Sequence, residues 1–397
     1  MAADVVVVGA GPAGAATAIL LAEHGLTVTV LERGPRARPK VCGEYLSPEG
    51  GRVLDRLGVL KAVDAGGAVA LAGMRITAPD GTVLDARYGK VGGFRPYREH
   101  AIGVSRATLD GALLDRVRAL PVDMRAGVRV TDVIVERGRV VGVVGMDAAG
   151  ARVEARGRVV IAADGRASVI VQRLGCRRPH RLARMALVTY VGGVPDCRDV
   201  GEIFVDPPDY AILNPLAPHR ANLSLVVPLA DAVPWRARLE DFFAARVKQL
   251  PHLARRLVGA DRVGPIASLG PLAYRVAPPR EGGVLFVGDA AGFYDPFTGE
   301  GIFTALRSAE LAAETVVSAL RAGDVSGAAL SAYERARRAA FADKARVTRI
   351  LQALIARRRL ANLAARWLAG RPRVLTALLG VIGDYVPPSA LPRLLLS

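Results

Sequence analysis

The stretch DVVVVGAGPAGAATAILLAEHGLTVTVLER, residues 4–33, decides the fold of this chain. Its four consecutive valines predict a strand that is buried on both faces, and the turn Gly9-x-Gly11-x-x-Gly14 follows directly. A helical segment comes next, and a second apolar run ends at Glu32. A strand, a glycine-rich turn, a helix and an acid about 20 residues further on form the fingerprint of a βαβ dinucleotide-binding unit.

Each part of this fingerprint has a physical purpose. Gly9 allows the tight turn, Gly11 lets the backbone approach a pyrophosphate, and Gly14 lets the helix pack closely on the strand. Free N–H groups at the start of the helix favour phosphate charge, and the carboxylate at the strand end can accept hydrogen bonds from a ribose. The residues of this unit that we expect to contact the dinucleotide are Gly9, Gly11, Pro12, Ala13, Gly14, Glu32 and Arg33.

The composition fits a large cytoplasmic α/β enzyme. The chain has 397 residues, of which 51% are hydrophobic, enough for a sizeable core. Its three cysteines are odd in number and form no CxxC pair, and its five histidines have no ligand spacing, so neither disulfides nor a metal site is expected. Residues 5–22 carry no charge, but their glycines and proline indicate a strand, a turn and a helix, so we reject a membrane span and a leader peptide.

The formal net charge of +17 is concentrated near the C-terminus. Between Arg335 and Arg373 there are eleven Arg and one Lys against one Asp, which gives that stretch a net charge of +11. Three interpretations stay open: a solvated helix face, contact with the anionic inner surface of the membrane, and contact with an acidic carrier protein. Nucleic acid is not expected, because few aromatic residues are present to stack on bases.

The rest of the chain alternates between parallel and antiparallel patterns. A strand, turn and strand are expected over 74–88, an amphipathic helix over 104–120, and an antiparallel meander from 127 to 163. Short strands separated by Pro-rich turns over 185–229 indicate an antiparallel sheet that forms one wall of a substrate cavity. A helix is expected over 239–258, a strand over 284–287, a long helix over 302–320, and helices over 326–397.

Three glycine-acid sites follow one another along the chain. They are GAGPAG with Glu32, then Asp164-Gly165, then Gly288-Asp289 with the PFTGEGI turn at 296–302. This set resembles the FAD-binding fold of the p-hydroxybenzoate hydroxylase superfamily. The residues of the motifs PFTGEGI and PKVCG, Pro39 to Gly43, are similar to those of the geranylgeranyl-reductase-like branch. The resemblance covers the chain up to about residue 320 and implies FAD as cofactor.

The resemblance implies a role for several polar residues. Glu32 would hold the adenosine ribose, Arg106 the phosphate or ribityl region, and Asp289 the ribityl chain. Asp164 would support the pyrophosphate and the passage of nicotinamide. Backbone N–H groups from Gly299 to Gly301, at a helix start, would stabilise the negative charge of reduced flavin. The other cofactor-contacting residues that the resemblance implies are Gly165, Gly288, Pro296, Glu300 and Ile302.

The expected fold is therefore α/β, a Rossmann-like FAD-binding domain with an inserted antiparallel meander, interleaved with an antiparallel-sheet substrate domain and followed by a helical C-terminal region. The FAD-binding domain is expected in three parts, the substrate domain in two, and the basic helical region at the end. In chain order the six segments are 1–73 (FAD), 74–100 (substrate hairpin), 101–180 (FAD), 181–270 (substrate sheet), 271–325 (FAD) and 326–397 (basic helices).

Reduced flavin can support three reactions in such an enzyme: halogenation, oxygenation and reduction of a carbon-carbon double bond. The halogenase signature WxWxIP is absent, since the only tryptophans are Trp235 and Trp367, so we set a halogenase aside. The prenyl-reductase pattern YxWxFP appears only in altered form over 210–215, with Ile and Asn in place of Trp and Phe. The first expectation is therefore an NAD(P)H-dependent monooxygenase that hydroxylates or epoxidises a hydrophobic, aromatic or polyketide-like molecule. The alternative is a reductase of isoprenoid carbon-carbon double bonds.

The catalytic candidates differ between these two interpretations. A phenolic substrate of a monooxygenase would need a hydrogen-bonding partner, for which Tyr45, Tyr210 or Asp295 could serve. A reductase would need a proton donor, for which Cys42 or Tyr210 could serve. No second glycine fingerprint is visible for NAD(P)H, in agreement with a transiently bound reductant or with another protein as electron donor.

Overall fold

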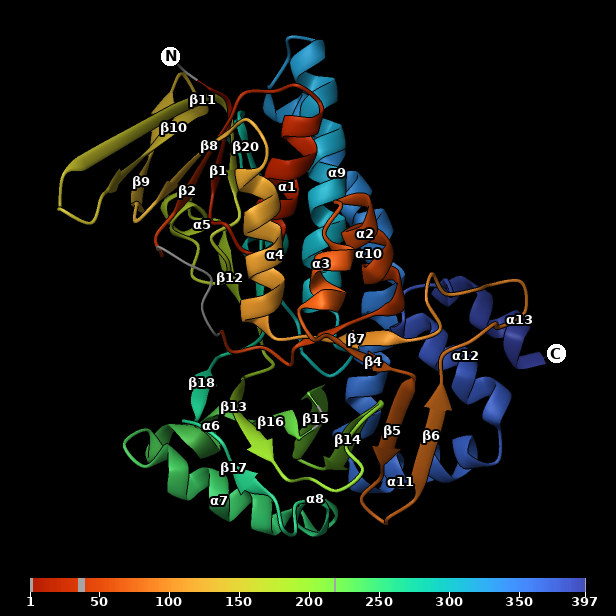
Figure 1. Cartoon of the computed structure of the whole chain (residues 1–397). Coiled ribbons are helices and arrows are strands. Elements are labelled where there is room, and N and C mark those ends of the chain that lie inside the picture. The colour runs from red at the N-terminus through yellow and green to blue at the C-terminus, as the bar shows by residue number, and fades with distance from the viewer. Residues whose placement is uncertain (1–2, 35–39, 218, 397) are drawn as a thin grey trace.

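The computed structural model describes residues 3–34, 40–217 and 219–396 (Figure 1). A seven-stranded and an eight-stranded sheet lie at opposite ends of the molecule, and long helices connect them (Figure 1). Pro39, the first residue of the PKVCG motif, lies outside the described residues. The predicted fold class is confirmed.

The seven-stranded sheet is the nucleotide-binding sheet expected from residues 4–33. Its order is β8-β2-β1-β11-β10-β9, with β20 also beside β11. The strands β8, β2, β1, β11 and β20 are parallel, whereas β9, β10 and the first half of β11 form the antiparallel meander. The strands are β1 Ala3–Val8, β2 Val28–Glu32, β8 Val122–Ala126, β9 Arg129–Glu136, β10 Arg139–Met146, β11 Arg152–Ala162 and β20 Val284–Phe286.

The four valines of β1 divide their side chains between the two faces of this sheet. Val5 and Val7 pack with the helices α1 Pro12–Glu23, α4 Arg106–Arg118 and α9 Gly301–Arg321. Val6 and Val8 pack with the meander and with α5 Val169–Arg173. A strand covered on both sides needs an apolar residue at every position, which is why the run is unbroken.

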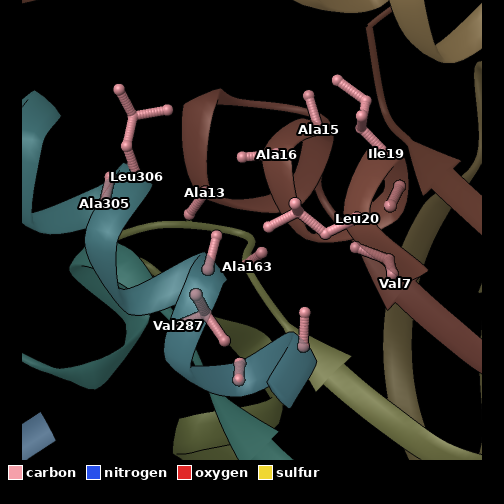
Figure 2. Packing of buried hydrophobic residues seen from close by; sticks show 14 of the residues in the cluster. Val7, Ala13, Ala15, Ala16, Ile19, Leu20, Ala163, Val287, Ala305 and Leu306 are labelled. Carbon is pink, nitrogen blue, oxygen red and sulfur yellow. The ribbon is translucent and has the colours of Figure 1, made fainter. Parts of the chain in front are cut away.

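Small side chains bring α1 and α9 together over the end of β20. Figure 2 shows Ala13 and Ala16 of α1 facing the segment of α9 that carries Ala305 and Leu306, with Val287 close by. The glycines of the fingerprint serve the same packing. Gly9 has φ +96°, and a Cβ on Gly14 would lie 1.8 Å from the Gly9 carbonyl oxygen, so neither position accepts another residue without a shift of backbone.

The eight-stranded sheet is antiparallel except where β14 runs parallel to β5. Its order is β17-β13-β16-β15-β14-β5-β6, with β18 also beside β13. The strands are β5 Gly73–Thr77, β6 Val83–Arg87, β13 Arg184–Gly192, β14 Val200–Asp206, β15 Asp209–Ala217, β16 Arg220–Pro228, β17 Asp261–Arg262 and β18 Ala267–Leu269.

The two faces of the eight-stranded sheet have different covers. One face packs on α6 Leu229–Ala232, α7 Leu239–Gln249 and α8 Pro251–Arg256. The other face shares a core with α11 Arg358–Ala369 and α12 Pro372–Ile382. The expected single helix over 239–258 is wrong, because Pro251 has no N–H to continue it and Leu250 before it is extended, with ψ 92°.

Shorter elements join the two sheets. The strands β3, β4 and β7 form a three-stranded sheet, and β12 pairs with β19. Their bounds are β3 Tyr45–Leu46, β4 Val69–Leu71, β7 Ala101–Gly103, β12 Arg177–Pro179 and β19 Tyr274–Val276. The remaining helices are α2 Pro48–Arg56, α3 Leu60–Ala65, α10 Gly327–Ile355 and α13 Leu391–Leu396, with 3-10 turns η1 Val233–Trp235, η2 Gly288–Ala291 and η3 Pro388–Ala390.

The helix α10 reaches from one sheet to the other. Near its start Tyr333 donates a hydrogen bond to the carbonyl of Phe286 in β20, over 2.8 Å. Near its end Gln352 contacts Asp295, which in turn contacts Tyr210 of β15.

The division of the chain into six segments stays a prediction. Within the described residues, no helix is both long and apolar enough to cross a bilayer.

Candidate active site

A cavity of about 580 Å³ lies between the two sheets. Its two ends differ in chemistry: one is lined by the glycine-acid motifs, the other by aliphatic side chains of the eight-stranded sheet and of α10 to α12. The predicted cofactor residues that line the first end, here called the nucleotide end, are Gly9, Gly11, Pro12, Ala13, Glu32, Arg33, Arg106, Asp164, Gly165, Asp289, Pro296, Gly299, Gly301 and Ile302.

Three predicted cofactor residues do not line the cavity. Gly14 packs against Gly9 within the fingerprint. Gly288 packs against α1, where a Cβ would lie 2.7 Å from the Cβ of Ala13. Glu300 points its carboxylate toward α10, where it accepts a hydrogen bond from Thr348 over 3.0 Å. These three residues support the elements of the nucleotide end without lining the cavity themselves.

The fingerprint leaves space where a phosphate would lie. Gly11 precedes α1, and a Cβ placed on it would meet only Lys40 Nζ at 3.7 Å and Arg106 Nη2 at 3.9 Å. Both cations are held by the buried Asp110, at 3.0 Å from Lys40 and 2.9 Å from Arg106. A helix N-terminus beside two positioned cations suits a pyrophosphate. Sequence reasoning missed Lys40, although it lies inside the PKVCG motif.

The two strand-end acids offer acceptors for hydroxyl groups. Glu32 accepts hydrogen bonds from the N–H groups of Ala10, at 2.7 Å, and Gly34, at 3.0 Å, which fixes its carboxylate at the edge of the cavity. Asp164 accepts one from Val169 over 2.8 Å, while its other oxygen is buried without a partner among the described residues. Burial raises the pKa of Asp164. FAD is rich in hydroxyl groups, so these residues fit that cofactor.

The loop 295–301 places the start of α9 at the cavity. Gly299 has φ +67°, and a Cβ on it would lie 2.5 Å from the Tyr45 ring, so glycine is needed there. The helix α9 begins at Gly301, and the N–H groups of its first turn provide positive potential at the cavity edge. This is the arrangement that suits the negatively charged edge of a reduced flavin.

A row of polar residues on α10 holds this loop from the side of the C-terminal helices. Lys344, Thr348 and Gln352 are buried and spaced four residues apart, so they share one helix face. Thr348 donates to Glu300, and Gln352 donates to Asp295 over 2.5 Å. Sequence reasoning missed this row, although its spacing was visible.

The residue Lys344 of this row pairs with the buried Asp384 and lies 3.8 Å from the Glu300 carboxylate. Burial raises the pKa of Asp384 to about 6, although the positive charge of Lys344 acts to lower it. Native Asp384 therefore keeps its proton to higher pH than the unfolded chain does, and the free energy of unfolding falls as pH rises through roughly 4 to 6.

Replacing Lys344 by methionine is expected to destabilise the protein by about 3 kcal/mol at pH 8, because the Asp384 carboxylate then has no cation. The loss should be smaller near pH 5, where Asp384 binds a proton in the native state. Urea unfolding at the two pH values measures both. The double variant K344M/D384N should recover most of the loss, and an equal loss at both pH values would contradict this account.

Tyr210 and Asp295 do not lie where a substrate-binding role would need them. The Tyr210 hydroxyl donates to Asp295 over 2.6 Å, both side chains are buried, and neither lines the cavity. Burial raises the pKa of both groups. Tyr210 shares its strand face with the cavity-lining Ile212 and Asn214, but its ring packs edge-on against Phe297, with ring centres 5.2 Å apart, and its hydroxyl is taken by Asp295.

Tyr45 and Cys42 do line the cavity, but their polar groups have different surroundings. The Tyr45 hydroxyl is hydrogen-bonded to that of Tyr88, and burial raises the Tyr45 pKa well above its ordinary value. Burial also raises the pKa of the Cys42 thiol, while the nearby Arg106 opposes the shift. At neutral pH Cys42 is therefore a thiol at the junction between the nucleotide end and the aliphatic end.

The backbone around Cys42 is clamped by strands of the eight-stranded sheet. Asn222 donates to the Cys42 carbonyl over 2.9 Å, and Asn214 to the Gly43 carbonyl over 2.8 Å. Glu44, buried and at φ +54°, accepts from the Arg106 N–H at 2.8 Å and from Asn222 at 3.0 Å. This clamp fixes the thiol position. Sequence reasoning missed Glu44 and Asn222, which are distant in the chain.

The chain resembles known flavoproteins over nearly its whole length. The family model described as FAD binding domain matches residues 2–348. The digeranylgeranylglycerophospholipid reductase of Methanothrix thermoacetophila is 31% identical over 356 residues, which cover 84% of this chain and 83% of the reductase.

Two solved structures share its fold. The flavin-dependent brominase Bmp2 has a TM-score of 0.85 at 21% identity and covers 100% of this chain and 98% of its own. A geranylgeranyl bacteriochlorophyll reductase-like protein from Thermoplasma acidophilum has a TM-score of 0.74 at 22% identity and covers 100% of this chain and 96% of its own.

The family match and the identity to the reductase agree with the geometry of the nucleotide end. Within the described residues, no group of three or more His, Cys, Asp or Glu side chains is placed to hold a metal ion. The chain belongs to the FAD binding domain family of FAD-dependent oxidoreductases, in its geranylgeranyl-reductase-like branch.

Proposed function

We propose that the protein is an FAD-dependent reductase of carbon-carbon double bonds in a long, aliphatic, isoprenoid-like substrate. One observation carries the proposal: the Cys42 thiol, whose pKa is raised by burial, lines the cavity between the nucleotide end and an almost wholly aliphatic chamber. The sequence alone favoured the monooxygenase over the reductase, and the structure leads us to place the reductase first. The residues expected to hold a phenol are hydrogen-bonded within the protein: Tyr210 to Asp295, neither of which lines the cavity, and Tyr45 to Tyr88.

The chamber suits a chain of hydrocarbon more than a polar ring. Its polar side chains are few, and the amide N–H of Asn214 and the hydroxyl of Ser224 are both used within the protein. An apolar cavity gains about 0.8 kcal/mol for each buried CH₂ group. The aliphatic residues that line it are Met74, Ile76, Leu84, Val188, Ile203, Val205, Ile212, Val226, Leu269, Leu272, Val347, Leu351, Leu354, Ile355, Leu368, Leu375, Leu378, Leu379 and Ile382.

The chemistry needs a hydride for one alkene carbon and a proton for the other. Reduced FAD, when bound, supplies the hydride, and thus both electrons for the new C–H bond. As the π bond breaks, the Cys42 Sγ–H gives its proton to the second carbon. Arg106, beside the sulfur, stabilises the thiolate that is left, which then takes a proton from water. NAD(P)H is the proposed source of the electrons, bound transiently.

The relatives support this choice. The 31% identical protein is named a digeranylgeranylglycerophospholipid reductase, a name that itself describes an unsaturated isoprenoid substrate. A halogenase is not favoured, despite the fold shared with a brominase. A flavin-dependent halogenase would use a lysine beside the substrate. Among the described residues, Lys40 is the single lysine that lines the cavity, and it is held by Asp110 at the nucleotide end, away from the aliphatic chamber.

A monooxygenase acting on a hydrophobic, hydroxylated molecule is the second candidate. One observation favours it: Asn214 lines the cavity, and its side-chain oxygen is buried without a hydrogen-bond partner among the described residues. Such an oxygen could accept a hydrogen bond from a substrate hydroxyl. Replacing Asn214 by aspartate or leucine would then change substrate affinity for hydroxylated molecules selectively.

Anaerobic reoxidation of the reduced holoenzyme tests the proposal. The protein, reduced with dithionite, is mixed without oxygen with a geranylgeranyl lipid, and flavin absorbance is followed. Reoxidation by the unsaturated lipid, but not by its fully saturated analogue, supports the reductase. If neither lipid reoxidises the flavin while air with a phenolic lipid yields hydroxylated product, the monooxygenase replaces it.

A further inference from the structure

The outer side of the helices that close the aliphatic chamber carries a dense positive surface. The segment 344–383 contains eight Arg and one Lys and no acidic residue. The exposed residues of 346–373, on the second half of α10, on α11 and on the turn after it, are here called the basic surface. Arg357, Arg359 and Arg373 make no ion pair with any described residue, so their charge is available to a partner.

Large apolar side chains stand within this basic surface. Ile350 is 60% exposed, Leu363 61% and Trp367 48%. Leu363 and Trp367 are one helical turn apart on α11, and the Arg371 guanidinium lies 4.4 Å from the centre of the Trp367 ring. Apolar and aromatic side chains among unpaired cations match the interface of an anionic bilayer, which has charge outside and hydrocarbon beneath.

The same helices form the chamber wall. Leu351 and Ile355 of α10 and Leu368 of α11 line the cavity, whereas Ile350 and Trp367, their chain neighbours, face solvent. The wall is therefore one helix thick at this place. A lipid dissolved in a bilayer that touches the basic surface would have a short path into the chamber.

We propose that the basic surface docks the protein on the surface of an anionic lipid bilayer. The inference goes beyond the proposed function and does not depend on it, since docking needs no turnover. A bilayer is preferred to an acidic carrier protein because three apolar side chains accompany the cations, and because they lie on the helices that enclose the apolar chamber.

Vesicle flotation with the FAD-loaded, full-length protein tests the proposal. Vesicles of phosphatidylglycerol and phosphatidylcholine should carry the protein upward, and vesicles of phosphatidylcholine alone should do so much less. Binding should weaken as NaCl rises from about 50 to 500 mM, because the Debye length falls from more than 10 Å to less than 5 Å. Absence of binding to phosphatidylglycerol vesicles at the lowest salt would overturn the proposal.

Matched variants locate the surface. The pair R357Q/R359Q should weaken binding roughly 25-fold, because each cation near an anionic leaflet contributes about a factor of five. The control R137Q/R152Q removes the same charge from the β9 to β11 meander, at the opposite end of the molecule from α11 (Figure 1), and should bind as wild type. An equal loss in both pairs would mean that net charge alone drives binding, and would overturn the proposal.

The tryptophan provides a second readout that does not depend on charge. Lipids brominated on their acyl chains should quench the protein's fluorescence, and W367F should lose that quenching while it keeps its fold. Displacement from vesicles by an equimolar soluble acidic carrier protein would assign the basic surface to a carrier and contradict membrane docking.

Discussion

Replacing Cys42 by alanine is expected to slow alkene reduction by about 10²- to 10⁴-fold, the range that a positioned general acid contributes. The thiol lines the cavity at the junction of its two ends, and the clamp formed by Asn222 and Asn214 fixes the backbone on either side of it. FAD affinity should stay near that of wild type, because Cys42 is not part of the fingerprint. Single-turnover reoxidation of the reduced holoenzyme measures the step directly.

The pH profile adds an independent test of Cys42. Because burial raises the pKa of this thiol, the proton is present at neutral pH and is lost only in the alkaline range. The rate should thus be flat through neutral pH and fall at alkaline pH, and C42A should lack that fall. Cys197, which does not line the cavity, supplies the control: C197A should react as wild type. A C42A enzyme with normal turnover would remove Cys42 from the mechanism.

Replacing Gly11 by valine is expected to weaken FAD binding by at least about 100-fold, roughly 3 kcal/mol, without loss of the fold. A Cβ at Gly11 would meet only the ends of Lys40 and Arg106, at 3.7 and 3.9 Å, so the protein itself leaves space beside this position. The same space is where a pyrophosphate would approach the start of α1. Titration of the apoprotein with FAD, followed by flavin fluorescence, measures the loss.

Gly14 supplies the contrast for this prediction. Its Cβ would lie 1.8 Å from the Gly9 carbonyl oxygen, so G14A should lower the stability of the apoprotein. G11V should unfold at the same urea concentration as wild type. Wild-type FAD affinity in G11V would mean that the cofactor lies elsewhere, and it would contradict the assignment of the nucleotide end.

Local patterns predicted much of this fold. The four valines of β1, the glycine spacing after them and the acid at the end of β2 depend on contacts within thirty residues, and they form the expected βαβ unit. The meander and the strands after residue 185 also follow from alternation and turn residues. The match to the FAD binding domain family confirms the family that these motifs indicated.

Contacts between distant segments could not be predicted in the same way. Tyr210 shares a strand face with the cavity-lining Ile212 and Asn214, and it is contacts with the distant Asp295 and Phe297 that keep it from lining the cavity. The clamp of Glu44 by Asn222 joins residues 178 positions apart. The basic C-terminal region was expected as a separate helical segment, whereas its helices also line the chamber through residues such as Leu351 and Leu379.

The most direct test of the central claim is the mass of the product formed by the NAD(P)H-reduced enzyme from a geranylgeranyl lipid, with and without oxygen. The account predicts a product about 2 Da heavier for each double bond reduced, the same with and without air, because one hydride and one proton are added. A product about 16 Da heavier that forms only in air would contradict it, because an oxygen atom would then have been inserted.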